Sequence, residues 1–189
     1  MKLVQLSNWL WVIFWVLWLI WGWITTRQRQ VVVKGQWGFG PRWWLILIAA
    51  IFIAPNHYGR LMSSSLWPHN DAVMGAGLAL ELLGLAFAIW ARSHLGNLWS
   101  GVAVLREGHR VVDAGPYRLV RHPIYTGILM GLVGTFFVYG DLLQLFILMG
   151  VVYAFRWKIS AEEKLLTDEF GSEYLTYRQS TRMLIPWLL

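Results

Sequence analysis

Five apolar runs divide the chain, and polar or turn-forming stretches separate each run from the next. The runs are Asn8–Thr25, Trp43–Ala54, Ala72–Trp90, Ile124–Tyr139 and Leu142–Trp157. A helix needs about 17 to 25 residues to cross the hydrocarbon core of a bilayer, and the first run reaches that length without a charge. We therefore predict an all-α, polytopic membrane protein with five transmembrane helices.

The second run is short for a span and Pro41 and Pro55 bracket it, so a re-entrant segment is an alternative on length alone. The distribution of lysine and arginine favours a span. If all five runs cross, nearly all basic residues share one side, whereas a re-entrant second run would separate the loops around Arg27 and Arg106. Because basic loops stay in the cytoplasm, we predict an inner-membrane protein with its N-terminus outside and its C-terminus cytoplasmic.

Composition narrows the class of protein further. Hydrophobic residues make up 57% of the chain, charged residues 14%, and cysteine is absent. An ordinary soluble domain carries about one quarter charged residues, so these values exclude that class of protein. The lack of cysteine excludes disulfide frameworks and cysteine nucleophiles. The net charge of +6 is assigned to membrane orientation, and we expect the lipid bilayer, not nucleic acid, as partner. No histidine has neighbours that suggest a metal site.

Small residues predict how the helices pack. The connection Gly140-Asp141 is so short that the last two runs must form an antiparallel hairpin. Glycine and alanine recur on one face of the third and fourth runs, which allows close helix approach. These residues are Gly77, Gly84, Ala88, Gly127, Gly131 and Gly134.

Two intramembrane features have alternative interpretations. Glu81 lies within the small-residue face of the third run, and it is either a functional carboxyl group or a hydrogen-bonded packing residue, of which we favour the second. Trp11, Trp15 and Trp18 recur at helical spacing in the first run. We expect these rings to face lipid rather than to line a ligand site.

Most of the remaining polar residues gather in two stretches, Arg92–Tyr125 and Arg156–Pro186, which both fall on the predicted cytoplasmic side. Pro123 suits the first turn of the fourth helix. The fifth helix is expected to continue out of the membrane until Gly171, and a short helix over Glu173–Arg178 follows.

Four motifs occur in these stretches in a fixed order. They are Gly-Pro-Tyr-Arg at 115–118, Arg-His-Pro-x-Tyr at 121–125, Glu-Glu at 162–163 and Phe-Gly-x-Glu-Tyr-x-x-Tyr at 170–177. Together they resemble the isoprenylcysteine carboxyl methyltransferase family over about half the chain, from roughly Leu95 to Pro186. The second motif is also similar to one in phospholipid methyltransferases and in the C-terminal part of sterol reductases.

The resemblance implies a membrane enzyme that uses S-adenosyl-L-methionine and encloses it with the C-terminal helices. Carried over by position, the cofactor contacts fall on His109, Arg110, Val111, Val112, Tyr117, His122, Pro123, Ile124, Tyr125 and Glu162. In eukaryotic members an arginine four residues before the glutamate contacts the substrate. Lys158 occupies that position here, with Arg156 two residues earlier, so either cation is a candidate to orient the acceptor.

The residue types suit that cofactor. Tyrosine rings attract a sulfonium through cation–π interaction, a carboxylate accepts hydrogen bonds from ribose hydroxyls or an ammonium, and Arg121 is of the right type for the cofactor carboxylate. A carboxylate acceptor needs no general base. If the acceptor is a thiol or an amine, His122 or Glu163 is the candidate base.

We therefore predict an S-adenosylmethionine-dependent methyltransferase acting on a lipophilic acceptor from the membrane, most simply an isoprenylcysteine-type carboxylate. Residues 1–91 would support the acceptor side, and residues 92–189 would carry catalysis. The alternatives are an NADPH-dependent reductase resembling the sterol reductases and a non-catalytic membrane partner protein, in which the basic residues only contact anionic headgroups.

Overall fold

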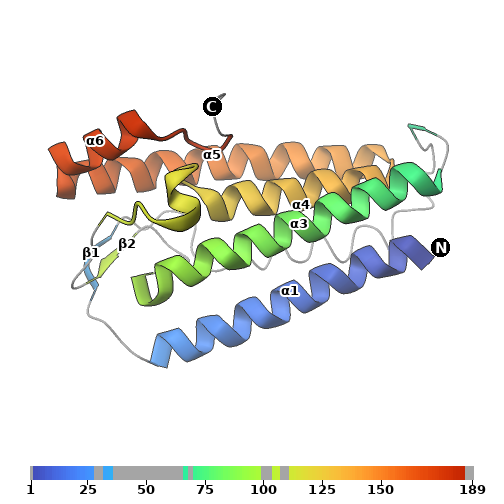
Figure 1. Cartoon of the computed structure of the whole chain (residues 1–189), viewed down its shortest axis with the longest axis horizontal. Helices are drawn as coiled ribbons and strands as arrows, with labels where there is room; N and C mark the ends of the chain where they lie inside the picture. Colours follow the sequence, from blue (N-terminus) through green and yellow to red (C-terminus); the bar gives the residue numbers. More distant parts are fainter. Residues whose placement is uncertain are drawn as a thin grey trace.

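The computed structural model describes residues 2–27, 32–35, 66–67, 70–98, 104–106 and 111–185. Four long helices lie alongside one another: α1 (Lys2–Arg27), α3 (Asp71–Leu95), α4 (Pro123–Tyr139) and α5 (Leu142–Phe170) (Figure 1). The short helix α6 (Ser172–Ser180) and the 3₁₀ helices η1 (Gly96–Leu98) and η2 (Gly115–Arg118) complete the helical elements of these residues. The predicted all-α membrane fold is confirmed.

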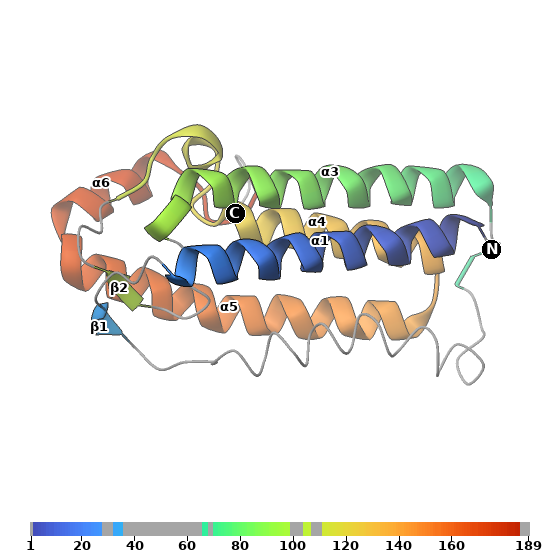
Figure 2. The same cartoon turned by 90° about the horizontal axis from the view of Figure 1, so that it is seen from below.

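Two short strands were not predicted. Strands β1 (Val32–Gly35) and β2 (Val104–Arg106) form one antiparallel pair. The pair lies at the end of the bundle where α6 is found (Figures 1 and 2). The predicted run Trp43–Ala54 lies outside the described residues, so the total of five spans stays a prediction.

Three described helices are long and apolar enough to cross a membrane, namely α1, α3 and α5, and α4 is a shorter apolar helix. Helix α5 has 29 residues. At about 1.5 Å per residue, a helix of that length exceeds a hydrocarbon core of about 30 Å. Its C-terminal part therefore extends beyond the apolar span, and α6 folds back beside it (Figure 1).

The hairpin between α4 and α5 forms as its turn sequence predicts. Gly140 ends α4 with φ of 67°, a left-handed conformation that glycine adopts without strain. The carboxylate of Asp141 then accepts a hydrogen bond from the backbone N–H of Gln144 at 2.8 Å and caps α5. This local turn sets α5 antiparallel to α4.

The predicted small-residue faces of α3 and α4 meet. A Cβ atom added at Gly84 would lie 2.5 Å from the backbone nitrogen of Gly131 and 2.6 Å from the carbonyl oxygen of Gly127. Such distances leave no room for any side chain. The two backbones are therefore in direct contact, which is how helices gain packing energy in lipid.

The expectation that the tryptophan stripe of α1 faces lipid is wrong. Trp11, Trp15 and Trp18 are 1%, 4% and 5% exposed, whereas Trp9 and Trp23 are about 60% exposed. The buried rings pack with Phe14 and belong to the same cluster as the buried residues of η2, α3, α4 and α5. Helical spacing identified one face of α1, but that face contacts other helices.

Glu81 lies within a hydrogen-bonded cluster that joins three helices. Its carboxyl group accepts hydrogen bonds from Ser7 of α1 at 2.6 Å and from Thr135 of α4 at 3.2 Å, and Trp11 donates to the Thr135 hydroxyl at 2.8 Å. The residue is fully buried. This arrangement agrees with a packing role for Glu81.

Gly84→Ala should destabilise the protein by about 1–3 kcal/mol, because the added methyl group must separate two backbones in contact. Gly75→Ala on the same helix is the matched control, since a Cβ there meets nothing within 4 Å. Thermal unfolding in detergent would test the difference, and equal melting temperatures for the two variants would contradict the packing described here.

Candidate active site

Most of the predicted site residues gather where α3 and α5 end and α4 begins. The segment with η2 that leads into α4, the end of α5 and the helix α6 lie together at this end of the bundle (Figure 1). The parallel bridge between Val120 and Arg182 joins the segment before α4 to the chain that follows α6. Motifs separated by more than 30 residues in the sequence thus meet at one end of the bundle.

Glu162 lies at the centre of one polar cluster. The hydroxyl of Tyr125 donates to its Oε1 at 2.7 Å, and the ammonium of Lys158 lies 3.8 Å from the same oxygen. The second oxygen, Oε2, is 3.7 Å from Nδ1 of His122. The Glu162 side chain is 20% exposed, so this carboxylate keeps an open side.

Glu163 points to a different set of partners, because successive residues on an α-helix are rotated by about 100°. Its Oε1 accepts a hydrogen bond from Nε of Arg121 at 2.7 Å and lies 3.3 Å from Nε2 of His122. Its Oε2 lies 3.8 Å from Nε of Arg178. Oε1 is hydrogen-bonded and Oε2 lies near a second guanidinium, so the geometry does not support Glu163 as a general base.

Aromatic rings pack against one another next to these polar groups. The His122 ring stacks on Tyr125 with centroids 5.7 Å apart, and Tyr125 contacts Phe155 at 4.6 Å. The ammonium of Lys158 lies 5.5 Å from the Tyr125 ring centroid, which is within cation–π range. Burial strengthens each of these electrostatic contacts by excluding water.

Arg121 connects the site to α6. Besides Glu163, its guanidinium donates from Nη1 to the backbone oxygens of Arg178 at 3.1 Å and Thr181 at 2.5 Å. These carbonyls stand at the C-terminal end of α6, where helices leave acceptors without intrahelical partners. Arg121 thus caps α6 and orients Glu163 at the same time.

The backbone of the Arg-His-Pro motif also holds the chain that follows α6. The N–H of Arg121 donates to the carbonyl of Arg182 at 2.8 Å, and the N–H of His122 donates to Met183 at 3.1 Å. Pro123 then begins α4, where its missing N–H costs no hydrogen bond. The motif therefore begins α4, caps α6 and binds the C-terminal segment.

A cavity of about 70 Å³ lies beside these clusters. Its lining contains four predicted cofactor residues, Val111, Val112, Tyr117 and Arg121, together with residues from α3, α5 and α6 that our cofactor set missed. The missed residues are Leu95, Leu166, Tyr174 and Tyr177. Of these four residues, Tyr174 and Tyr177 had a signal in the sequence, because their spacing places both on one face of a short helix.

The two tyrosine motifs are joined at this cavity. The hydroxyl of Tyr177 donates to the backbone oxygen of Tyr117 at 2.8 Å. Burial, and then the nearby Tyr177 and Glu162 charges, raises the pKa of Tyr117 well above its usual value, so its phenol stays neutral. Val111 and Tyr177 also line a larger groove of about 630 Å³ at the surface between η2 and α6.

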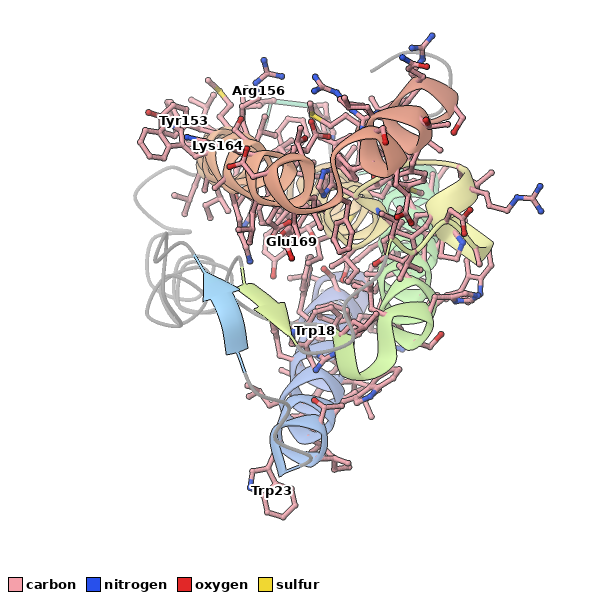
Figure 3. All side chains as sticks on the ribbon, turned by 90° about the vertical axis from the view of Figure 1, so that its left-hand side faces the viewer. Trp18, Trp23, Tyr153, Arg156, Lys164 and Glu169 are labelled. Carbon is pink, nitrogen blue, oxygen red and sulfur yellow. The ribbon has the colours of Figure 1, made fainter. Side chains whose placement is uncertain are left out.

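The remaining predicted residues are placed as follows. Ile124 is buried beside Tyr125 in the first turn of α4. Arg156 is exposed and points away from the bundle on the outer side of α5 (Figure 3). His109 and Arg110 lie outside the described residues. Within the described part of the chain, no group of three histidine or acidic residues could hold a metal ion.

The donor set fits a zwitterionic sulfonium cofactor. It offers a partly exposed carboxylate at Glu162 and the aromatic ring of Tyr125. Tyr117, but neither of these two residues, lines the cavity, whose walls combine apolar and phenolic side chains. A carboxylate accepts hydrogen bonds from hydroxyl or ammonium groups, and aromatic faces attract cations. S-adenosyl-L-methionine presents hydroxyl groups, an ammonium group and a sulfonium cation, which are the groups that such side chains bind.

Arg121→Lys should release the C-terminal segment, because an ammonium cannot donate to Glu163 and to two backbone oxygens with the geometry of a guanidinium. We expect tryptic cleavage after Arg182 to become several-fold faster. Arg118→Lys, three residues earlier on an exposed site, is the control. Unchanged cleavage in Arg121→Lys would show that other contacts hold the segment.

Comparison with known proteins supports the assignment made from the motifs. A family model described as phospholipid methyltransferase matches residues 73–173. Methanethiol S-methyltransferase 1 of Bradyrhizobium diazoefficiens is 42% identical over 143 residues, which are 68% of this chain and 48% of that protein. Protein-S-isoprenylcysteine O-methyltransferase B of Arabidopsis thaliana is 30% identical over 115 residues, which are 59% of this chain and 58% of that protein.

The fold agrees with these relatives. The structure of the eukaryotic intramembrane Ras methyltransferase ICMT superposes with a TM-score of 0.63 at 21% identity, over 80% of this chain and 55% of that one. The chain spans about half the length of the curated relatives it matches. The family model covers more than half of the chain, and the predicted resemblance to isoprenylcysteine carboxyl methyltransferases is confirmed. The chain therefore belongs to the phospholipid methyltransferase family of membrane proteins.

Proposed function

We propose that this protein transfers the methyl group of S-adenosyl-L-methionine to a lipophilic acceptor that arrives from the membrane. The observation that carries the proposal is the cluster in which Glu162 meets Tyr125, Lys158 and His122 at the end of an apolar helix. Such a cluster offers a cation site and an anion site side by side, at the level where a soluble cofactor and a lipid can meet.

The cofactor supplies a methyl group activated on a sulfonium. Glu162 would accept hydrogen bonds from its ribose hydroxyls or its ammonium, and the rings of Tyr117 and Tyr125 would face the sulfonium. Val111 and Val112 would contribute apolar walls next to Tyr117, an arrangement supported by the cavity that they share. His109 and Arg110, which the family resemblance also implies, complete the proposed cofactor set.

Lys158 is proposed to orient the acceptor. Its side chain is 10% exposed and lies between Glu162 and the Tyr125 ring, whereas Arg156 is exposed on the opposite side of α5. A buried ammonium attracts an anionic acceptor such as a carboxylate, and that nucleophile needs positioning and exclusion of water rather than a base. An isoprenylcysteine-type carboxylate is therefore our first candidate acceptor.

A small thiol is the second candidate, and the 42% identity to a methanethiol S-methyltransferase favours it. A thiol must lose its proton before attack, so this acceptor requires a base. His122 is the candidate base. Its Nδ1 lies 3.7 Å from Oε2 of Glu162, which is too far for a hydrogen bond between them. Glu163 does not suit this role, since its oxygens are engaged with Arg121, His122 and Arg178.

The proposal also assigns a role to each part of the chain and an orientation of the site in the membrane. Residues 92–189 would bind the cofactor and catalyse transfer, and residues 1–91 would form the membrane support on the acceptor side. The site would face the cytoplasm of an inner membrane, because the basic loops that direct orientation lie at the same end of the chain's helices.

Incubation of the purified protein with S-adenosyl-L-methionine labelled on the methyl group tests the function and separates the acceptors. The probes are N-acetyl-S-farnesylcysteine and methanethiol. We expect label in the farnesyl product, and alkali should release it as methanol because an ester hydrolyses. Label that survives alkali in a thioether would favour the thiol, and no transfer to either probe would contradict both candidates.

Lys158→Ala should raise the Michaelis constant for a carboxylate acceptor by about 10- to 100-fold, the equivalent of losing one hydrogen bond to a charged group. The affinity for S-adenosylhomocysteine should change little, because Lys158 is assigned to the acceptor. Arg156→Ala is the matched control and should leave both quantities unchanged. An effect of equal size in the two variants would refute the assignment of Lys158.

A further inference from the structure

The imidazole of His122 lies between two carboxylates that are adjacent in sequence. Nε2 is 3.3 Å from Oε1 of Glu163, and Nδ1 is 3.7 Å from Oε2 of Glu162. His122 and Glu163 are 7% and 8% exposed. Stacking on Tyr125 fixes the plane of the imidazole ring. Each nitrogen therefore has one defined carboxylate neighbour.

The two nitrogens differ in what they contact. An ionised carboxylate only accepts hydrogen bonds, so the 3.3 Å contact is a hydrogen bond when Nε2 carries the proton. Glu163 is held ionised at this position by Arg121, which donates to the same oxygen at 2.7 Å, and by Arg178 beside the other oxygen at 3.8 Å. The distance from Nδ1 to Glu162 exceeds that of a hydrogen bond.

We propose that Glu163 is a positioning residue, which holds the proton of His122 on Nε2 and leaves Nδ1 as the nitrogen that faces Glu162. Glu163 would then act on the cofactor or acceptor through His122, not by touching either. The two adjacent glutamates thus have different roles. Glu162 would face the ligand, and Glu163 would set which nitrogen of His122 carries the proton.

This division has a consequence for ligand binding, which rests on the proposed function. The charged and titratable groups around His122 are Arg121 beside it, Tyr125 on α4, Lys158, Glu162 and Glu163 on α5, and Arg178 on α6. When Nδ1 takes up the second proton of the ring, the imidazolium pairs with Glu162 and competes with a bound ligand for that carboxylate. Affinity for S-adenosylhomocysteine should therefore be lower for the doubly protonated ring than for the neutral one.

Nuclear magnetic resonance of protein labelled with ¹⁵N-histidine in detergent tests the proposal directly. The His122 signals are assigned by their loss in His122→Asn. We expect the neutral ring to show the Nε2–H pattern in the wild type. Glu163→Ala should show a mixture of the two tautomers, because no carboxylate then selects Nε2. The Nδ1–H pattern in the wild type, or an unchanged pattern in Glu163→Ala, would overturn the proposal.

Glu163→Gln separates hydrogen bonding from charge and serves if Glu163→Ala does not fold. The amide oxygen can still accept from Nε2, so the Nε2–H pattern should persist although a negative charge is lost. Asp168→Asn, an exposed acid on the same helix, should leave the His122 signals unchanged. Loss of the Nε2–H pattern in Glu163→Gln would contradict the proposal.

The outcome does not depend on the enzymatic assignment. The histidine signals report on Glu163 whether or not the protein binds S-adenosylhomocysteine. If the signals behave as expected and no binding occurs at any pH, the proposed function fails and the positioning role stands. If binding occurs and the signals do not respond to Glu163→Ala, the positioning role alone fails.

Discussion

The pairing of two carboxylates on successive residues of α5, one buried (Glu163) and one partly exposed (Glu162), is the constraint that organises the site. Charges taken out of water are stable only when partners and hydrogen bonds replace the lost solvent, and removing one partner of a buried pair typically costs about 3–5 kcal/mol. Glu162 and Glu163 obtain partners from α4, α5, α6 and the segment before α4. These elements must therefore meet at one place, although they are distant in sequence.

The membrane helices make this meeting possible. Glycine contacts between α3 and α4 bring two backbones together, and the tight turn at Gly140 sets α5 against α4. The start of α4 and the end of α5 consequently lie at the same end of the bundle, where the Arg-His-Pro and Glu-Glu motifs face each other. Function at this end depends on packing that is located along the whole length of the helices.

The sequence alone predicted the features that depend on local or periodic signals. Pro123 and Gly171 mark helix ends by their own backbone preferences, and glycine spacing identified the faces of α3 and α4. The motif order predicted that Tyr117, His122 and Glu162 share one site, and in the structure Nδ1 of His122 lies 3.7 Å from Glu162. Each of these inferences uses either the residues next to a position in the sequence or the order and spacing of motifs along the chain.

Features that depend on which surface meets which were not predictable in the same way. The strands β1 and β2 pair across about 70 residues, and no local pattern specifies such a partner. The spacing of Trp11, Trp15 and Trp18 defines a helix face but not whether lipid or protein covers it. In the same way, adjacency in sequence does not tell which of Glu162 and Glu163 is hydrogen-bonded to Arg121, because that depends on the position of Arg121.

The central claim is that Glu162 marks the site of a sulfonium-type cofactor. Calorimetric titration of the detergent-purified protein with S-adenosylhomocysteine, with NADPH titrated in parallel, tests this claim most directly. The account predicts micromolar binding of S-adenosylhomocysteine that is lost in Glu162→Ala and retained in Asp168→Asn, and no binding of NADPH. Binding of NADPH without S-adenosylhomocysteine, or full affinity in Glu162→Ala, would contradict it.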